Sequence, residues 1–251
     1  MSQLRAAILG CGNFAHQQAI ALNALPEQVK LVAVCDRHPE RAQAVADRHT
    51  GGQAAVFTDD RELIETAGLD LLVITLPPYG HTDEVERAAA KGIHLLIEKP
   101  IALTRQKAWQ MVAAAEAAGV KTQVGFKFRF GAAIERMRSM IESGAAGQVG
   151  LMSARYFANA LHAAWWRVRE KSGGQIVEQA IHMLDLMRFL MGEPESVYSR
   201  QENFFHRQMP DYTIEDVSAT VVSFHSGGLG VLYATNGAIP NRWINDYRVV
   251  A

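Results

Sequence analysis

The first residues suited to chemistry form a glycine-rich turn, Gly10-Cys11-Gly12-Asn13-Phe14-Ala15, which follows the apolar run of residues 4–9. In this GxGxxA pattern the first glycine allows a tight turn, and the second lets the backbone approach a pyrophosphate. The small third residue lets the next helix pack closely against the strand. The phosphates then lie at the N-terminus of that helix. Asp36 arrives about 20 residues after Ala15, at the end of a second apolar run. The alternative is a ligand-free turn with a surface aspartate. The combined pattern favours a dinucleotide site with these cofactor-binding residues: Gly10, Gly12, Asn13, Phe14, Ala15 and Asp36.

The residue type at Asp36 bears on the choice of cofactor. Its carboxylate can accept hydrogen bonds from both ribose hydroxyls and repels a 2′-phosphate, which favours NAD. Arg37 follows at once and can pair with a 2′-phosphate or stack on adenine, so NADP stays open.

Two later strand ends carry further candidates, because ligands of an open parallel sheet lie at the carboxyl ends of its strands. Thr75 and Pro77 turn the chain away from one strand, where they would line the middle of the cofactor. Glu98-Lys99-Pro100 places an ammonium group at the end of another. A partly desolvated lysine has a lowered pKa and can exchange protons near neutrality. The alternative is a Glu–Lys surface pair.

The second half of the chain contributes an acid–imidazole–acid series. Glu178, His182 and Asp185 are spaced i, i+4 and i+7, which places all three on one face of a predicted helix. An acid one turn from an imidazole can orient it and tune its pKa for general acid–base catalysis. Two alternatives are a surface charge cluster and a metal site using His182 and Asp185. No other His/Cys cluster lies nearby in the sequence, so we predict no metal.

Hydrophobic periodicity indicates which elements position these residues. In the first half, apolar strands alternate with helices, which predicts a doubly wound parallel sheet in a Rossmann domain over residues 1–123. In the second half the pattern changes to longer strands with few helices, which predicts an α+β domain with an open, mainly antiparallel sheet over residues 124–251. The expected strands are 4–9, 30–36, 70–76, 93–98, 121–125, 149–157, 195–203, 216–225 and 228–235. The expected helices are 14–25, 40–49, 61–67, 83–91, 105–118, 133–143 and 175–191.

Composition excludes several classes of protein. The 251 residues are 49% hydrophobic and 20% charged, with a formal net charge of -1, which is typical of a globular protein. No basic stripe is present, so nucleic acid and anionic membranes are not expected partners. No apolar run reaches the ~18 residues of a membrane helix. Two cysteines and the lack of a recognisable signal peptide favour the reducing cytoplasm.

Taken together, these motifs resemble the Gfo/Idh/MocA oxidoreductases, which include glucose-fructose oxidoreductase and inositol dehydrogenase. The resemblance rests on the GxGxxA turn, Cys35-Asp36-Arg37, Pro77-Pro78 with His81, Glu98-Lys99-Pro100, Gly125 with Arg129-Phe130, Trp165-Trp166-Arg167 and the Gly-Gly…His-x-x-Asp helix. It implies that Lys99 and His182 are catalytic, and we expect Glu178 and Asp185, on the same helix face as the histidine, to complete the catalytic residues. Glu178 stands where the family usually has aspartate, and Ala180 where it usually has glycine. The resemblance also implies that His81, Glu98, Lys99, Trp166 and Arg167 contribute to the cofactor site.

The resemblance further implies a sugar, cyclitol or polyol substrate and a homo-oligomer, dimer or tetramer, formed through the C-terminal sheet. Family members usually continue beyond Ala251, so the C-terminal sheet is expected to be shortened. The predicted function is an NAD(P)-dependent dehydrogenase acting on a secondary alcohol. The alternatives are a redox-neutral NAD-dependent glycosidase on the same scaffold and a non-catalytic NAD-binding regulatory protein.

Overall fold

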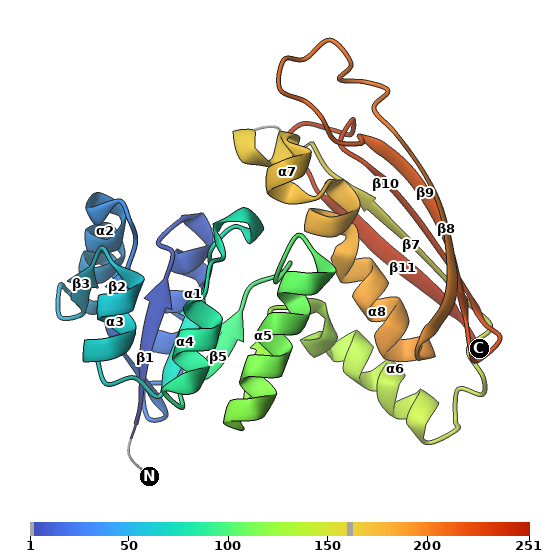
Figure 1. The fold of residues 1–251 in the computed structure, drawn as a ribbon. Coiled ribbons are helices and arrows are strands. Elements are labelled where there is room, and N and C mark those ends of the chain that lie inside the picture. Colours follow the sequence, from blue (N-terminus) through green and yellow to red (C-terminus); the bar gives the residue numbers. More distant parts are fainter. Residues whose placement is uncertain (1–2, 160–162) are drawn as a thin grey trace. The chain divides into compact units, whose positions relative to one another are not determined.

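The structure is a computed structural model that describes residues 3–159 and 163–251. The chain divides into two compact units, Met1–Gly125 and Phe126–Ala251. Each unit has its own sheet, as the ribbon in Figure 1 shows, and each has its own buried core. In the described part of the chain, no helix is both long enough and apolar enough to cross a membrane.

Unit 1 is built on a six-stranded parallel sheet with the strand order β3-β2-β1-β4-β5-β6. Because this order reverses direction after β1, the chain segments that leave the carboxyl ends of β1 and β4 run to opposite faces of the sheet, which is where sheets of this type bind ligands. The strands are β1 Leu4–Leu9, β2 Val29–Cys35, β3 Ala55–Phe57, β4 Leu71–Ile74, β5 His94–Ile97 and β6 Thr122–Val124. The helices are α1 Asn13–Asn23, α2 Pro39–Thr50, α3 Asp60–Thr66, α4 Glu84–Ala90 and α5 Arg105–Ala118.

Local sequence explains most of these elements. Helix α5 begins where the Thr104 hydroxyl accepts the Lys107 N–H at 3.2 Å, and it ends at Gly119, whose φ of 64° suits glycine. Strand β3 was not expected, because three residues are too few for a periodic signal. The doubly wound sheet expected from the sequence is confirmed.

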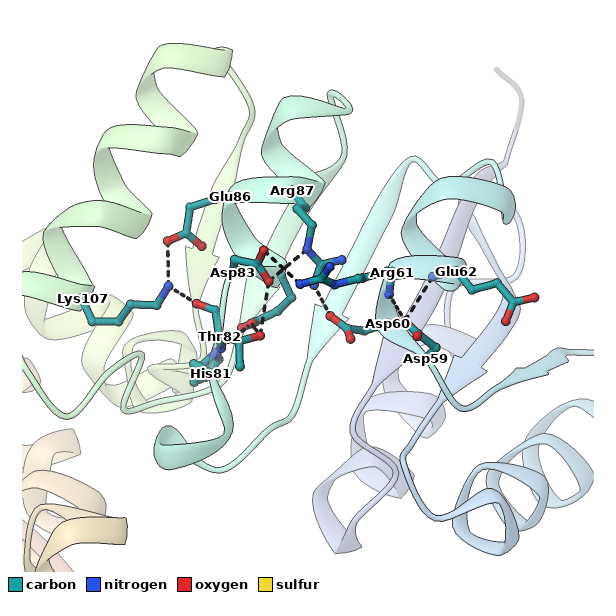
Figure 2. A network of polar contacts seen from close by, with 11 residues as sticks. Asp59, Asp60, Arg61, Glu62, His81, Thr82, Asp83, Glu86, Arg87 and Lys107 are labelled. Atoms are coloured by element: carbon teal, nitrogen blue, oxygen red, sulfur yellow. Dashed lines mark hydrogen bonds and ion pairs between the residues drawn. The ribbon is translucent and has the colours of Figure 1, made fainter.

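A polar network joins α3, α4 and α5 beside the turn that follows β4 (Figure 2). Arg87 on α4 bonds Asp60 on α3 and also contacts Asp83 at 3.1 Å. Lys107 on α5 contacts Glu86 at 2.7 Å and donates to the carbonyl of Thr82. Since these contacts converge on residues 82–87, they fix the chain that leaves β4 at the edge where a ligand is expected.

Unit 2 is built on a five-stranded sheet with the order β11-β7-β10-β9-β8. Strands β7 and β10 run parallel and the other neighbours antiparallel, which confirms the mainly antiparallel sheet. The strands are β7 Leu151–Phe157, β8 Pro194–Glu202, β9 Val217–Phe224, β10 Leu229–Thr235 and β11 Ile244–Val250. Strand β11 was not among the expected strands. In β9 the series Val217, Ala219, Val221, Ser223 faces outward, whereas Ser218, Thr220, Val222 and Phe224 are turned inward and buried.

Helices α6 Ala132–Glu142 and α8 Ile181–Met191 are the long helices of unit 2, and α8 packs on β7 and β10. A short helix, α7 Arg169–Ser172, lies between them in the sequence. The expected regular helix over residues 175–191 is wrong in its first part, because Ile176–Ala180 forms a π-helical turn. Such turns widen the helix and recur at functional sites.

Candidate functional site

The glycine turn of unit 1 has the backbone that a pyrophosphate site requires. Gly10 has a φ of 92°, and a Cβ there would lie 3.1 Å from the backbone of Thr75 and Leu76. Gly12 caps the start of α1 without a side-chain hydrogen bond, and a Cβ there would meet nothing within 4 Å. Ala15 is fully buried. The start of α1 therefore faces open space that an anion can occupy, where the helix dipole favours negative charge.

Asp36 is tied directly to this turn. Its Oδ2 accepts the Cys11 N–H at 2.7 Å, and its Oδ1 accepts the His38 N–H at 2.9 Å. A carboxylate offers about four lone-pair positions, so two remain for ribose hydroxyls. The exposed Arg37 follows it, and Asn13 and Phe14 are exposed on the first turn of α1. The residues present fit an adenine dinucleotide.

The segment after β4 is held by one contact to the glycine turn and one to the start of α4. The Thr75 hydroxyl bonds the carbonyl of Gly10, and Pro77 leads into a 3₁₀ turn, Pro78–Gly80. The imidazole of His81 bonds Glu84, and both side chains are only 1% exposed. His81 is thus packed inside the unit, where it fastens this turn to α4. Burial by itself raises the pKa of Glu84, but the His81 hydrogen bond and charge outweigh it and lower that pKa to about 2.

Glu98 and Lys99 follow β5 as expected, and the structure shows what fixes them. The Glu98 carboxylate accepts the Gln18 amide at 2.7 Å and the Lys99 N–H at 3.3 Å. It lies against Gly125, where a Cβ would come within 2.7 Å of it. The backbone of the half-buried Lys99 is therefore held in place, through Glu98, by Gln18 on α1 and by Gly125 at the end of β6.

In unit 2 the three expected residues Glu178, His182 and Asp185 are all buried, which argues against a surface charge cluster. The imidazole of His182 lies between two rings, with centroid distances of 4.8 Å to Phe128 and 6.2 Å to Phe126. Asp185 accepts both arms of the Arg129 guanidinium, one of them from Nε at 2.7 Å. That hydrogen bond raises the pKa of Arg129. Across residues 3–159 and 163–251, no three His, Cys, Asp or Glu side chains gather as a metal site would require.

Sequence reasoning missed Glu215, which shapes the start of this helix. Its buried carboxylate accepts the Ile176 N–H at 2.9 Å and the Arg169 guanidinium at 2.7 Å. A Cβ on Gly174, whose φ is 103°, would lie 2.4 Å from the same carboxylate. The Gly173-Gly174 pair was the available signal, because it marks a close approach of some other group. An acid cap at a helix N-terminus is favourable, so Glu215 fixes where the π-helical turn begins.

Trp166 and Arg167 lie in a 3₁₀ turn, Ala164–Arg167, and both are half-buried. The Arg167 carbonyl accepts the Thr213 N–H at 2.8 Å, which ties this turn to the segment between β8 and β9.

Two family models match the chain. Residues 4–126 match an oxidoreductase family with an NAD-binding Rossmann fold, GFO/IDH/MocA. Residues 134–250 match the GFO/IDH/MocA C-terminal domain. The first match confirms the NAD-binding Rossmann fold that the glycine turn and Asp36 predict.

Known proteins are similar over nearly the whole chain. The chain is 30% identical to scyllo-inositol 2-dehydrogenase (NAD(+)) of Bacillus subtilis (strain 168), over 93% of this chain and 67% of that protein. It is 27% identical to D-glucoside 3-dehydrogenase of Escherichia coli (strain K12), over 91% of this chain and 69% of that protein. The WlbA dehydrogenase of Bordetella pertussis, solved with NADH and UDP-GlcNAcA, superposes with a TM-score of 0.89. That superposition covers 100% of this chain and 77% of the other, at 26% identity.

Proposed function

Because the chain belongs to the GFO/IDH/MocA oxidoreductase family, we propose that it transfers hydride between a secondary alcohol and a nicotinamide dinucleotide. The alcohol is a hydroxyl of a sugar, cyclitol or related polyol. The observation that carries the proposal is the open N-terminus of α1 at Gly12 with Asp36 bonded to the same turn. The dehydrogenases of a glucoside and an inositol among its relatives support the polyol class.

The two units have different roles in this proposal. Residues 1–123 bind the dinucleotide, with the phosphates at Gly10, Gly12 and the first turn of α1, and the ribose at Asp36. Thr75, Pro77, His81 and Glu98 shape the edge of the sheet that receives it, and Trp166 and Arg167 are further cofactor-binding residues. Residues 124–251 bind the substrate. Asp36 makes NAD the preferred cofactor over NADP.

Three side chains handle the proton and the charge on the substrate oxygen. His182 takes up the hydroxyl proton, and the buried Glu178 stabilises the imidazolium that results. Lys99 donates to the oxygen as negative charge develops on it. When bound, NAD supplies the hydride acceptor.

The test is turnover by the purified chain with NAD⁺, scyllo-inositol and methyl glucosides, followed as NADH absorbance. NADP⁺ serves as the parallel cofactor. We expect net NADH formation with at least one polyol and a lower rate with NADP⁺. His182→Ala and Lys99→Ala should each lower kcat at least ~100-fold while NAD⁺ affinity, measured by calorimetry, stays within about threefold.

Other outcomes decide against the proposal. Substrate consumption by NMR without NADH accumulation indicates a redox-neutral reaction such as glycoside hydrolysis. NAD⁺ binding with no conversion of any alcohol indicates a regulatory protein. Unchanged turnover in both variants contradicts the roles of Lys99 and His182.

We also propose that the chain forms a homo-oligomer through the outer face of the unit 2 sheet. Tyr198, Val221 and Tyr233 on strands β8, β9 and β10 are exposed on this face, and neighbouring exposed apolar side chains mark association sites. Analytical ultracentrifugation should find a dimer or tetramer, and Val221→Arg should shift it towards monomer. Val45→Ile, inside unit 1, is the matched control; a monomeric parent chain contradicts the proposal.

A further inference from the structure

An ion pair between Arg129 and Asp185, which are 56 residues apart in sequence, joins the start of unit 2 to α8. Arg129 lies in the 3₁₀ turn Lys127–Phe130, and Asp185 lies on α8 three residues after His182. The guanidinium bonds both carboxylate oxygens of Asp185, whose side chain is only 6% exposed. This two-armed geometry suits arginine and is unavailable to lysine.

The same guanidinium is held in place by aromatic rings. It lies 4.9 Å from the centroid of Phe189 on α8 and 5.7 Å from that of Phe126. Stacking and the two hydrogen bonds together leave it one orientation. The turn that carries Arg129 is therefore fixed to α8 at a defined position along the helix.

This fixed turn is also what packs on the imidazole. Phe128, next to Arg129, lies 4.8 Å from the His182 ring, and Phe126 meets the ring edge-on at 6.2 Å. Aromatic packing of this kind restricts the orientation of an imidazole and excludes water from it. The charged residues of these three elements are Glu178 on the π-helical turn, Asp185 and Arg188 on α8, and Lys127 and Arg129 on the 3₁₀ turn.

We propose that Asp185 is a positioning residue that acts through Arg129, and that their ion pair sets the orientation of His182 by holding Phe126 and Phe128 against its ring. The proposal rests on the function proposed above. It assigns Arg129 a role that the sequence did not suggest. It moves Asp185 from the expected catalytic residues to a positioning role, because a single guanidinium engages both of its oxygens.

A double-mutant cycle tests this assignment. The variants are Arg129→Lys, Asp185→Asn and the double variant, assayed for NADH formation. We expect each single variant to lower kcat by a similar factor, ~10–100-fold, with KM within about threefold, because a misplaced imidazole transfers the proton poorly. The double variant should be no slower than the slower single variant, since both changes break the same contact.

Arg138 provides a matched control. It also stacks on Phe189, at 4.8 Å, and it bonds Glu142 and the Phe189 carbonyl, but it lies on α6. Arg138→Lys should leave kcat within about twofold.

A second readout does not need turnover. The imidazole signals of His182 are assigned by comparison with His182→Gln and titrated by NMR in the complete chain. Arg129→Lys and Asp185→Asn should each move the midpoint of that titration, and Arg138→Lys should leave it unchanged.

Three results would overturn the proposal. One is a loss of kcat in Asp185→Asn with Arg129→Lys unaffected, which would mean that Asp185 acts on the substrate itself. Another is additive losses in the double variant. The third is lowered unfolding stability with kcat and the His182 titration unchanged. Failure of the proposed function can be told apart from failure of this proposal. In the first case the parent chain shows no turnover, but the His182 titration can still be measured in all variants.

Discussion

The Glu98 carboxylate lies directly over the α-carbon of Gly125, so close that a methyl group on Gly125 would come within 2.7 Å of Glu98 Oε2. The same carboxylate accepts the N–H of Lys99 at 3.3 Å. The backbone of Lys99, a proposed catalytic residue, is thus held by Glu98. The position of Glu98 in turn requires glycine at residue 125, directly after β6.

Gly125→Ala should displace Glu98 and, with it, Lys99. Overpacking of this kind costs about 1–3 kcal/mol of unfolding free energy, and kcat should fall because the ammonium group moves. The free energy comes from urea unfolding and kcat from NADH formation. Gly150→Ala is the control, because a Cβ there meets nothing within 4 Å. Wild-type stability and kcat in Gly125→Ala would show that the contact is dispensable.

Glu215→Leu should destabilise unit 2. It leaves the Ile176 N–H and the Arg169 guanidinium without the carboxylate that they bond, and an unpaired buried donor costs about 1–3 kcal/mol. Urea unfolding measures the loss. Glu193→Gln, which removes an exposed ion pair with Arg188, should cost less than about 0.5 kcal/mol. Equal costs for the two variants would contradict a capping role for Glu215.

The buried His81–Glu84 pair predicts a loss of stability in acid. The folded-state pKa of Glu84 is about 2, below its ordinary value of 4.5. Its contribution is therefore complete above pH 4.5 and is lost as the pH falls towards 2. Glu84→Gln should cost roughly 3 kcal/mol at pH 7 and progressively less in acid. Urea unfolding from pH 7 to pH 3 measures the difference.

Glu40→Gln is the control for that series, because Glu40 also lies near a histidine, His38, but both side chains are well exposed. It should have little effect at any pH. A constant difference between Glu84→Gln and the parent chain across the range would contradict the pKa assigned to Glu84.

The two thiols should be inert in the folded protein. Burial, with a smaller contribution from the Asp36 charge, raises the pKa of Cys11 from 9.0 to about 12. Burial, followed by the charges of Asp60 and Asp36, raises the pKa of Cys35 to about 12 as well. At pH 8 the thiolate population is then about a thousandfold lower than that of an ordinary thiol.

Mass spectrometry after iodoacetamide treatment tests this prediction. The native chain should stay unmodified over the time in which guanidinium-unfolded chain is alkylated twice. Because the unfolded thiols ionise first, stability should also fall as the pH rises from 9 towards 12. Rapid alkylation of the native chain at pH 8 would contradict the burial of these side chains.

The sequence alone determined the features that depend on short stretches of chain. The alternation of apolar strands and helices predicted the doubly wound sheet, and Thr104 and Gly119 marked the ends of α5. The glycine turn with Asp36 predicted the NAD-binding fold, since both belong to the first strand–helix–strand unit. Such features are readable because residue type and spacing fix the local backbone.

Only the tertiary structure decided which distant groups meet. The regular spacing of Glu178, His182 and Asp185 did not reveal the π-helical turn, which begins where Glu215 bonds the Ile176 N–H from 39 residues away. The same holds for β9. Alternation of residue types along a strand defines two faces, but only the helices that pack on the sheet decide which of the two is buried. Long-range contacts such as Arg129 with Asp185 leave no periodic trace, since they depend on how whole elements pack.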